Sequence, residues 1–162
     1  MPQQLDEILA QVPFFEGMAE DELALIAGCG RNVHFDAGET IFRQGDAADN
    51  FFVVRHGTVA VGNFVPPRGE LVIETLEAGD LLGWSWLFPP YLWHFDARAT
   101  EPTKAICFSG VLLRQHRDED LMLSHELFKR TCEVMARRLQ IARRKLLNMK
   151  SPSAPRESTG ST

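Results

Sequence analysis

The spacing of hydrophobic residues changes twice along the chain and divides it into three parts. In residues 5–12 apolar side chains recur at helical spacing until Pro13, and residues 20–27 repeat this pattern before Gly28. Acidic residues open the second segment, where the helix dipole favours negative charge. We therefore predict two short helices within residues 1–31, packed on the domain that follows.

Between Asn32 and Gly110 the pattern changes to short β-type runs, separated by glycine, proline and Asx turns about every 8–12 residues. The runs predicted as strands are residues 33–35, 40–42, 51–54, 58–61, 71–74, 98–100 and 105–108. Many short strands joined by tight turns are typical of a sandwich or jelly-roll barrel rather than of a parallel α/β sheet. We expect a mainly β fold with flanking helices, in which residues 32–117 form a jelly roll (double-stranded β-helix).

Helical spacing returns in residues 118–150, which open with three acidic residues and contain neither glycine nor proline. A heptad seam of about four repeats, apolar except for one histidine, runs along this segment: Leu121, His125, Phe128, Cys132, Met135, Leu139, Ala142, Leu146 and Met149. A second stripe lies beside it and consists of Leu127, Val134 and Ile141. We expect a long helix with one stripe on the barrel and the other left for a partner.

A heptad seam of this length requires a partner, and we expect that partner to be a second copy of the chain. The residues assigned to this homodimer contact are Leu121, Phe128, Cys132, Met135, Leu139 and Leu146. Packing of the helix within a single subunit is the alternative. After the helix, residues 151–162 are rich in Ser, Pro, Thr and Gly, and we expect them to form a disordered tail.

The composition is that of a globular protein. Of the 162 residues 44% are hydrophobic and 24% are charged, and 17 basic against 22 acidic residues leave a formal net charge of −5. This charge gives no overall attraction for nucleic acid or for an anionic membrane. Three cysteines without CxxC spacing favour neither a disulfide framework nor a zinc site, as expected for a reducing compartment.

The sequence predicts neither a membrane span nor a secretory signal. The N-terminus lacks a basic region followed by an apolar run. The longest stretch without Asp, Glu, Lys or Arg, residues 81–95, has 15 residues and contains Pro89-Pro90. It is shorter than the ~20 residues of a transmembrane helix. We expect a cytoplasmic protein that does not contact the membrane.

One segment carries a recognisable motif. Residues 41–59 contain the turn Gln44-Gly45-Asp46, a further aspartate at position 49, an aromatic-rich strand, and Gly57 before the next strand. This segment resembles the cyclic nucleotide-binding domain of the catabolite-activator and protein-kinase regulatory-subunit superfamily. The glycine permits a turn with positive φ, and the aspartate can cap the backbone amides of the turn.

The resemblance extends on both sides and covers about residues 5–148. Residues 9–26 are similar to the entry helices of the family, residues 78–83 to the turn that opens its phosphate-binding cassette, and residues 118–148 to its long C-terminal helix. The resemblance implies a β-roll that holds a ligand beneath a helical lid, with the lid also forming a dimer.

The cassette itself departs from the family pattern. In the family a glutamate accepts a hydrogen bond from the ribose 2′-hydroxyl, and an arginine pairs with the cyclic phosphate. In an ungapped match, Trp84 takes the place of that glutamate and Trp93 the place of that arginine. Loss of one partner of a buried charge-assisted pair typically costs ~2–5 kcal/mol. We therefore expect a pocket altered away from the usual recognition of cAMP and cGMP.

Aromatic residues are concentrated in the same region, where six occur within residues 84–95. Three interpretations are open: the rings fill the nucleotide pocket, they line a cavity for another flat or apolar small molecule, or weak cyclic nucleotide binding is retained. Polar handles for such a molecule are Ser85, His94 and Asp96. The candidate ligand-binding residues are Gly83, Trp84, Ser85, Trp86, Trp93, His94 and Arg98.

No sequence signature of an enzyme or a metal site is present. The five histidines never occur as HxH or HExxH, and no GxSxG, GxxxxGK[ST] or GxGxxG motif occurs. Transcriptional members of the family carry a helix-turn-helix domain after the long helix. Here 12 residues follow it, so we expect no DNA binding in the usual family manner.

The sequence therefore predicts a non-enzymatic regulatory sensor that forms a homodimer and passes its state to an effector protein. No cofactor is assigned with certainty; a cyclic nucleotide or another small flat or apolar ligand is the candidate. The alternative is a ligandless domain for dimerisation or protein interaction.

Overall fold

The computed structural model describes residues 5–64, 69 and 71–150 of the chain. Three helical segments open the described part, namely α1 (Leu5–Leu9), the 3-10 turn η1 (Pro13–Phe15) and α2 (Glu20–Ala27). Gly28 and Gly30 follow α2, and the chain then enters the first strand. The two predicted N-terminal helices are confirmed, with η1 between them.

Eight strands follow among the described residues: β1 (Gly30–Phe35), β2 (Thr40–Phe42), β3 (Asn50–His56), β4 (Val59–Asn63), β5 (Leu71–Leu76), β6 (Leu81–Leu82), β7 (Asp96–Ala99) and β8 (Thr103–Ser109). They form two four-stranded sheets with the strand orders β1-β8-β3-β6 and β2-β7-β4-β5. All pairings are antiparallel. The expected mainly β jelly roll with flanking helices is thus confirmed, and β6 is a strand that the sequence did not predict.

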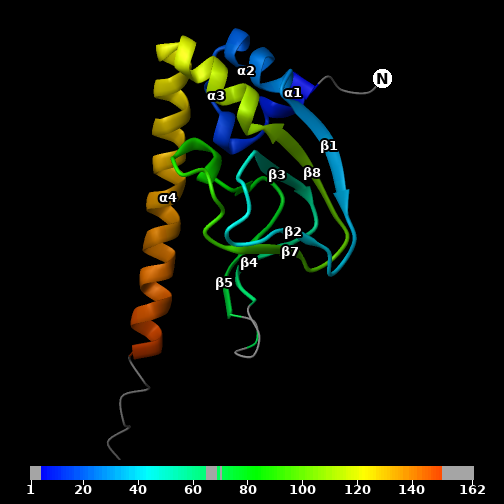
Figure 1. Ribbon diagram of the computed structural model, residues 1–162, viewed down its shortest axis with the longest axis vertical. Coiled ribbons are helices and arrows are strands. Elements are labelled where there is room, and N and C mark those ends of the chain that lie inside the picture. Colours follow the sequence, from blue (N-terminus) through cyan, green and yellow to red (C-terminus); the bar gives the residue numbers. More distant parts are fainter. Residues whose placement is uncertain (1–4, 65–68, 70, 151–162) are drawn as a thin grey trace, which may run out of the picture.

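The hydrophobic core has two parts, one on each face of the first sheet. Residues that alternate along β3 face opposite sides: Phe51 and Val53 pack toward the helices, whereas Phe52 and Val54 point into the roll. Figure 1 shows α1, α2 and α3 gathered at the upper end of the molecule and the sheets below them. The long helix α4 runs down one side of the roll.

The chain becomes helical again earlier than the sequence predicted. Helix α3 (Gly110–Glu119) lies within the range 32–117 that was expected to be β-roll, and Ser109 caps it by accepting a hydrogen bond from the Leu112 N–H. Its polar residues give only a weak apolar periodicity, which hides it from pattern analysis.

Helix α4 (Leu121–Lys150) directly follows Asp120. The carboxylate of Asp120 accepts hydrogen bonds from the N–H groups of Met122 and Leu123. Of the three acidic residues predicted to open the helix, only Asp120 caps α4, whereas Asp118 and Glu119 are the last two residues of α3. The face of α4 that packs on the domain carries Leu123, Leu127, Thr131 and Val134, all buried. This buried face includes two members of the predicted second stripe.

Much of the heptad seam faces outward in the single chain. Leu121 and Leu139 are 85% and 71% exposed, Leu146 and Met149 are also exposed, and so is Cys132. Phe128 and Met135 are half-buried. The ring of Phe128 lies 5.7 Å from the ring of Phe88 in the same chain, so part of the seam already has a partner within the domain.

Arg130 ties α4 to the N-terminal segment. Its guanidinium donates hydrogen bonds to the carbonyls of Phe14 (2.9 Å) and Glu16 (2.6 Å), and to the carboxylate of Glu126 (2.8 Å). The hydrogen bond from Arg130 is the main reason that the pKa of Glu126 lies below its usual value. The hydrogen bonds of Arg130 thus fix α4 against η1 and the residue that follows it.

We expect Arg130→Met to lower the free energy of unfolding by about 2–3 kcal/mol, because it leaves two carbonyls and a carboxylate without their donor. Chemical denaturation followed by circular dichroism measures this change. Lys129→Met is the matched control at an exposed neighbouring position, and it should change the free energy by less than ~0.5 kcal/mol. Equal effects of the two substitutions would contradict this role of Arg130.

Candidate functional site

The site is built on residues 83–95, which connect β6 to β7 and which we call the cassette. Gly83 follows β6 directly with φ at +94°, in the left-handed region that favours glycine. A Cβ atom at this position would lie 2.6 Å from the ring of Trp93. Only glycine therefore lets the indole of Trp93 lie against the backbone here.

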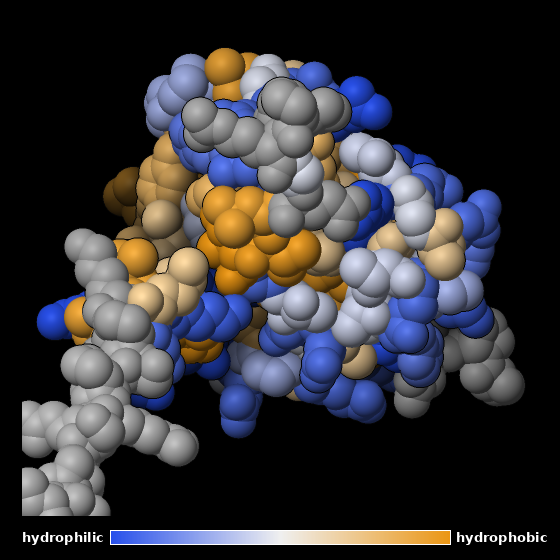
Figure 2. Space-filling view, turned by 90° about the horizontal axis from the view of Figure 1, so that it is seen from below, coloured by the Kyte–Doolittle hydropathy of each residue, from blue (hydrophilic) through white to orange (hydrophobic). Residues whose placement is uncertain are grey.

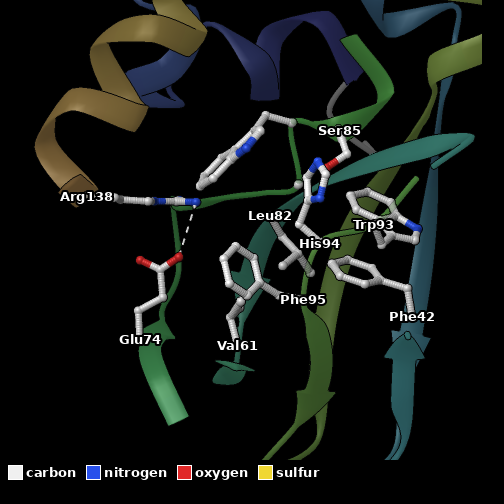
Figure 3. A pocket seen from close by; sticks show the side chains of 11 residues that line it. Phe42, Val61, Glu74, Leu82, Ser85, Trp93, His94, Phe95 and Arg138 are labelled. Atoms are coloured by element: carbon white, nitrogen blue, oxygen red, sulfur yellow. Dashed lines mark ion pairs between the residues drawn. The ribbon is translucent and has the colours of Figure 1, made fainter. Parts of the chain in front are cut away.

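The indole of Trp93 closes this part of the roll. It stacks on Phe42 of β2 with 3.8 Å between ring centroids and 6° between ring planes (Figure 3). Two backbone hydrogen bonds of 2.9 Å hold the main chain of Trp93 to the Gln-Gly-Asp turn. The Gly45 N–H donates to the Trp93 carbonyl, and the Trp93 N–H donates to the Asp46 carbonyl. The motif turn and the cassette are thus one rigid unit.

A cavity of about 30 Å³ remains between the cassette and α4. Five of the seven predicted ligand-binding residues line it, namely Gly83, Trp84, Ser85, Trp93 and His94. A single water requires about 10–15 Å³ of such space, and small-molecule sites usually measure about 300–1,000 Å³. The volume of this inner cavity is therefore about one tenth of the lower end of that range.

The other two predicted residues lie elsewhere. Trp86 is 1% exposed, and its ring stacks on Phe51 of β3 with 4.8 Å between centroids, in the core beneath the helices. Arg98 is on β7, with its guanidinium 4.8 Å from the ring of Phe64. Neither residue lines the cavity, so the aromatic cluster of the sequence divides between the core and the site.

The expected polar handles differ in their environment. The carboxylate of Asp96 accepts hydrogen bonds from the backbone N–H groups of Gln44 (2.8 Å) and Phe64 (2.9 Å). Asp96 therefore organises the roll rather than facing the cavity. Ser85 is buried in the 3-10 turn η2 (Ser85–Leu87), while His94 is exposed at the edge of the cavity.

The structure adds two charged residues that the sequence analysis did not assign to the site, Arg138 of α4 and Glu74 of β5. Their side chains form an ion pair with 3.7 Å between Nη1 and Oε1 (Figure 3). Arg138 also donates from Nη2 to the carbonyl of Leu81, and its guanidinium carbon lies 5.3 Å from the ring centroid of Trp84. In the sequence, Arg138 was one member of a basic run near the end of the long helix, with nothing to distinguish it.

Burial changes the pKa of both partners in this pair. It raises the pKa of the Glu74 carboxyl above its usual value, and the positive charge of Arg138 opposes that shift. Burial lowers the pKa of the Arg138 guanidinium, against the opposing effect of Glu74. In both residues desolvation outweighs the attraction of the partner, as expected for an ion pair that is not in close contact.

Two arginines of α3 hold the other side of the cassette. Arg114 donates hydrogen bonds to the carbonyls of Trp86 (2.7 Å) and Ala48 (3.2 Å), and Arg117 donates to the carbonyl of Leu87 (2.8 Å). The turn η2 is therefore fixed to the helix that leads directly into α4. These hydrogen bonds therefore link the cassette to α4 through α3.

Membrane-spanning helices and metal-binding clusters are both absent from the part of the chain that the structure describes. No helix in it combines the length and the apolar character needed to cross a membrane. Within the same residues, His, Cys, Asp and Glu side chains do not gather in threes in a way that would hold a metal ion. The site is composed of aromatic rings, one hydroxyl, one imidazole and an ion pair, a composition suited to non-covalent binding.

A β-roll of two four-stranded antiparallel sheets with a long helix at its side defines a jelly-roll domain with flanking helices. The family profile described as cyclic nucleotide-binding domain matches residues 32–120. The chain belongs to the cyclic nucleotide-binding domain family.

Curated relatives include regulators of two kinds. The chain is 26% identical over 136 residues to a CRP-like cAMP-activated global transcriptional regulator of Mycobacterium tuberculosis, which covers 84% of this chain and 59% of the relative. It is 33% identical over 81 residues to the cGMP-dependent protein kinase egl-4 of Caenorhabditis elegans, covering 49% of this chain and 10% of the kinase. The chain thus spans about three fifths of the first relative and a small part of the second.

Solved structures support the same family. A putative cyclic nucleotide-binding protein from Geobacter metallireducens has a TM-score of 0.76 at 25% identity, covering 83% of this chain and 97% of the other. The regulatory domain of Toxoplasma gondii PKA, solved with cAMP, has a TM-score of 0.65 at 26% identity, covering 80% of this chain and 49% of the other.

The contact of Trp93 with Gly83 generates a prediction for stability. Gly83→Ala should lower the free energy of unfolding by about 1–3 kcal/mol more than Gly45→Ala, because the added methyl group must displace the indole ring. Gly45 is the matched control: its φ is +91°, but a Cβ there meets no atom within 4 Å. Gly45→Ala therefore reports only the backbone strain, about 1–2 kcal/mol.

Denaturation of both variants measures the difference, and tryptophan emission reports the position of the indole. Equal losses of stability in the two variants, with unchanged emission, would mean that Trp93 does not lie on Gly83.

Proposed function

We propose that this protein is a non-enzymatic regulatory module whose pocket no longer recognises cAMP or cGMP in the usual family pose. The observation that supports the proposal most directly is the inner cavity of about 30 Å³, which Trp93 and Phe42 occupy from the side of the roll. In the sequence match, Trp93 stands where the family has its phosphate-binding arginine. The indole ring fills the space that a cyclic phosphate requires. It also lacks the positive charge that would pair with the phosphate.

The regulatory part of the proposal draws on the relatives. One is named as a cAMP-activated transcriptional regulator and another as a cGMP-dependent kinase, and in both the matching region is only part of the protein. We infer a signalling role here in which α4 passes the state of the domain to an effector protein. The expected cytoplasmic location rests on the odd number of cysteines and stays a prediction.

Calorimetric and tryptophan-fluorescence titration with cAMP and cGMP tests the proposal, because all three tryptophans lie in the cassette. We expect no saturable heat and no spectral change up to about 1 mM nucleotide, since loss of a buried charge-assisted contact lowers affinity by about 30-fold or more. The mycobacterial cAMP-activated relative serves as the positive control.

Saturable binding at micromolar nucleotide would contradict the proposal. If Arg98→Ala then abolished that binding, a displaced arginine on β7 would be the phosphate ligand. If binding survived in Arg98→Ala, the cassette would have opened around the nucleotide in another way.

We further propose that the exposed part of the heptad seam joins two copies of the chain along α4. The side chains that support this are Leu139 and Leu146, which are both exposed, together with the exposed Cys132 one heptad before Leu139. A contiguous apolar stripe on a long helix is unfavourable in water and is covered when two such helices meet. The alternative, a seam that stays within one subunit, leaves these residues in solvent.

Light scattering of the full chain should give a mass of twice the 18.2 kDa of one chain. Leu139→Asp should shift the protein to the monomer, because it places a charge in the apolar contact. Gln140→Asp adds the same charge at the next exposed position, away from the seam, and should leave the dimer intact. A monomeric wild-type protein, or identical behaviour of the two variants, would overturn this interface.

A further inference from the structure

A second, larger cavity lies next to the inner cavity and shares Glu74, Trp84, Phe95 and Arg138 with it. The groove between β5 and α4 has a volume of about 330 Å³, within the usual range for small-molecule sites. Its walls are mainly apolar: Ile73 and Phe95 with Trp84 on the side of the roll, and Met135 and Leu139 on α4. We call this the lid groove.

Hydrophobic surface surrounds this end of the molecule. Figure 2 views the molecule from below and shows hydrophobic side chains gathered in the middle of that face. Leu71 and Val72 of β5 are 60% and 44% exposed, and Ile141 of α4 is 49% exposed. The lid groove therefore has apolar side chains on both walls, and β5 carries further exposed apolar side chains next to those that line it.

Arg138 and Glu74 stand where three cavities meet. Both residues line the inner cavity, the lid groove, and a third groove of about 350 Å³ on the other side of the pair. Figure 3 shows the two side chains reaching toward each other from α4 and β5. The pair thus lines the lid groove together with the two neighbouring cavities.

The guanidinium of Arg138 is buried with few acceptors. Its side chain is 14% exposed, and it makes one hydrogen bond, to the carbonyl of Leu81, among the residues that the structure describes. The carboxylate of Glu74 is 3.7 Å away, beyond a normal hydrogen bond. A guanidinium has five N–H donors, so most of those of Arg138 have no acceptor among the described residues and can reach the cavities that this side chain lines. A buried cation of this kind gains from an additional anionic acceptor.

We propose that the lid groove binds a flat, apolar organic monoanion, a hydrophobic carboxylate or sulfonate, with its anionic group on Arg138 and its rings between Trp84 and Leu139. The proposal rests on the proposed function, because it takes the inner cavity as closed to nucleotides. Arg138 supplies from the lid helix the cation that the cassette lacks, and Glu74 is the internal carboxylate with which the ligand competes.

The chemistry of the site selects this class of ligand. A single guanidinium already faced by one carboxylate favours one added negative charge over the two of a phosphate monoester. Apolar walls favour a ligand without the hydroxyl groups of a sugar, because those groups would lose their hydrogen bonds to water. The aromatic face of Trp84 favours a planar ring system.

The probe for the test is 1-anilinonaphthalene-8-sulfonate, an apolar aromatic monoanion, added to the full chain. We expect one saturable site per chain at micromolar probe, with energy transfer from the cassette tryptophans to the probe. Arg138→Gln should weaken binding about tenfold or more, because it removes a charge-assisted contact. Arg137→Gln is the control on the same helix at an exposed position, and it should leave the affinity unchanged.

A neutral probe of the same shape separates charge recognition from folding. N-phenyl-1-naphthylamine lacks the sulfonate, so its binding should be the same in the wild-type protein and in Arg138→Gln. Glu74→Gln should strengthen sulfonate binding several-fold, because it removes the competing carboxylate from Arg138 while keeping the shape of the side chain. This gain of affinity is a result that a damaged fold does not produce.

Three results would overturn the proposal: no saturable sulfonate binding by the wild-type protein, unchanged sulfonate binding in Arg138→Gln, or equal loss of both probes in that variant. Each is distinct from a failure of the proposed function, which appears only in the titration with cAMP and cGMP. Micromolar nucleotide binding that displaces the sulfonate would refute both proposals together.

Discussion

The placement of Trp93 over Gly83 is the contact on which the rest of the site depends. Because residue 83 has no side chain and adopts a positive φ, the indole can lie against the backbone and stack on Phe42. The same tryptophan is bonded through its backbone to the Gln-Gly-Asp turn. One aromatic ring therefore joins the motif turn to the cassette and fills the space between them. The cavity that remains, about 30 Å³, is small because these two functions fall on one residue.

Four arginines of α3 and α4 share one kind of contact, a hydrogen bond to a backbone carbonyl of a neighbouring segment. Arg114 and Arg117 of α3 donate to cassette carbonyls, while Arg130 and Arg138 of α4 donate to carbonyls of η1 and β6. A guanidinium that bonds backbone carbonyls fixes the position of a chain segment without requiring a particular side chain in return. Three of these four arginines attach the helices to the cassette or to β6, immediately before it, whereas Arg130 attaches α4 to η1.

The sequence was sufficient for the fold because the fold depends on local patterns. Alternation along the strands, turn glycines and the long uninterrupted helix each leave a trace in a single sequence. Helix α3 and the two-residue strand β6 leave little trace, since one is polar and the other is too short for a period. The site was predicted only in part for a different reason. The sequence does not distinguish the three tryptophans of the cassette, Trp84, Trp86 and Trp93. In the structure, Trp86 stacks on Phe51 in the core, whereas Trp93 stacks on Phe42 in the roll. Arg138 was one basic residue in a run of several, and only the three-dimensional approach of α4 to β5 singles it out.

The position of the buried cation determines how binding at this site can act on the lid. An arginine in the cassette would hold a ligand to the roll alone, whatever the lid does. Arg138 belongs to α4 and reaches across to β5 and β6, so its present contacts with Glu74 and Leu81 already hold the helix against the roll. A ligand that engages this guanidinium bonds to the lid itself and competes with the contacts that fix it. Leu139, the next residue, lines the lid groove and belongs to the heptad seam. The proposed occupation of the groove and the proposed pairing of two α4 helices therefore share Leu139 and involve its neighbour Arg138.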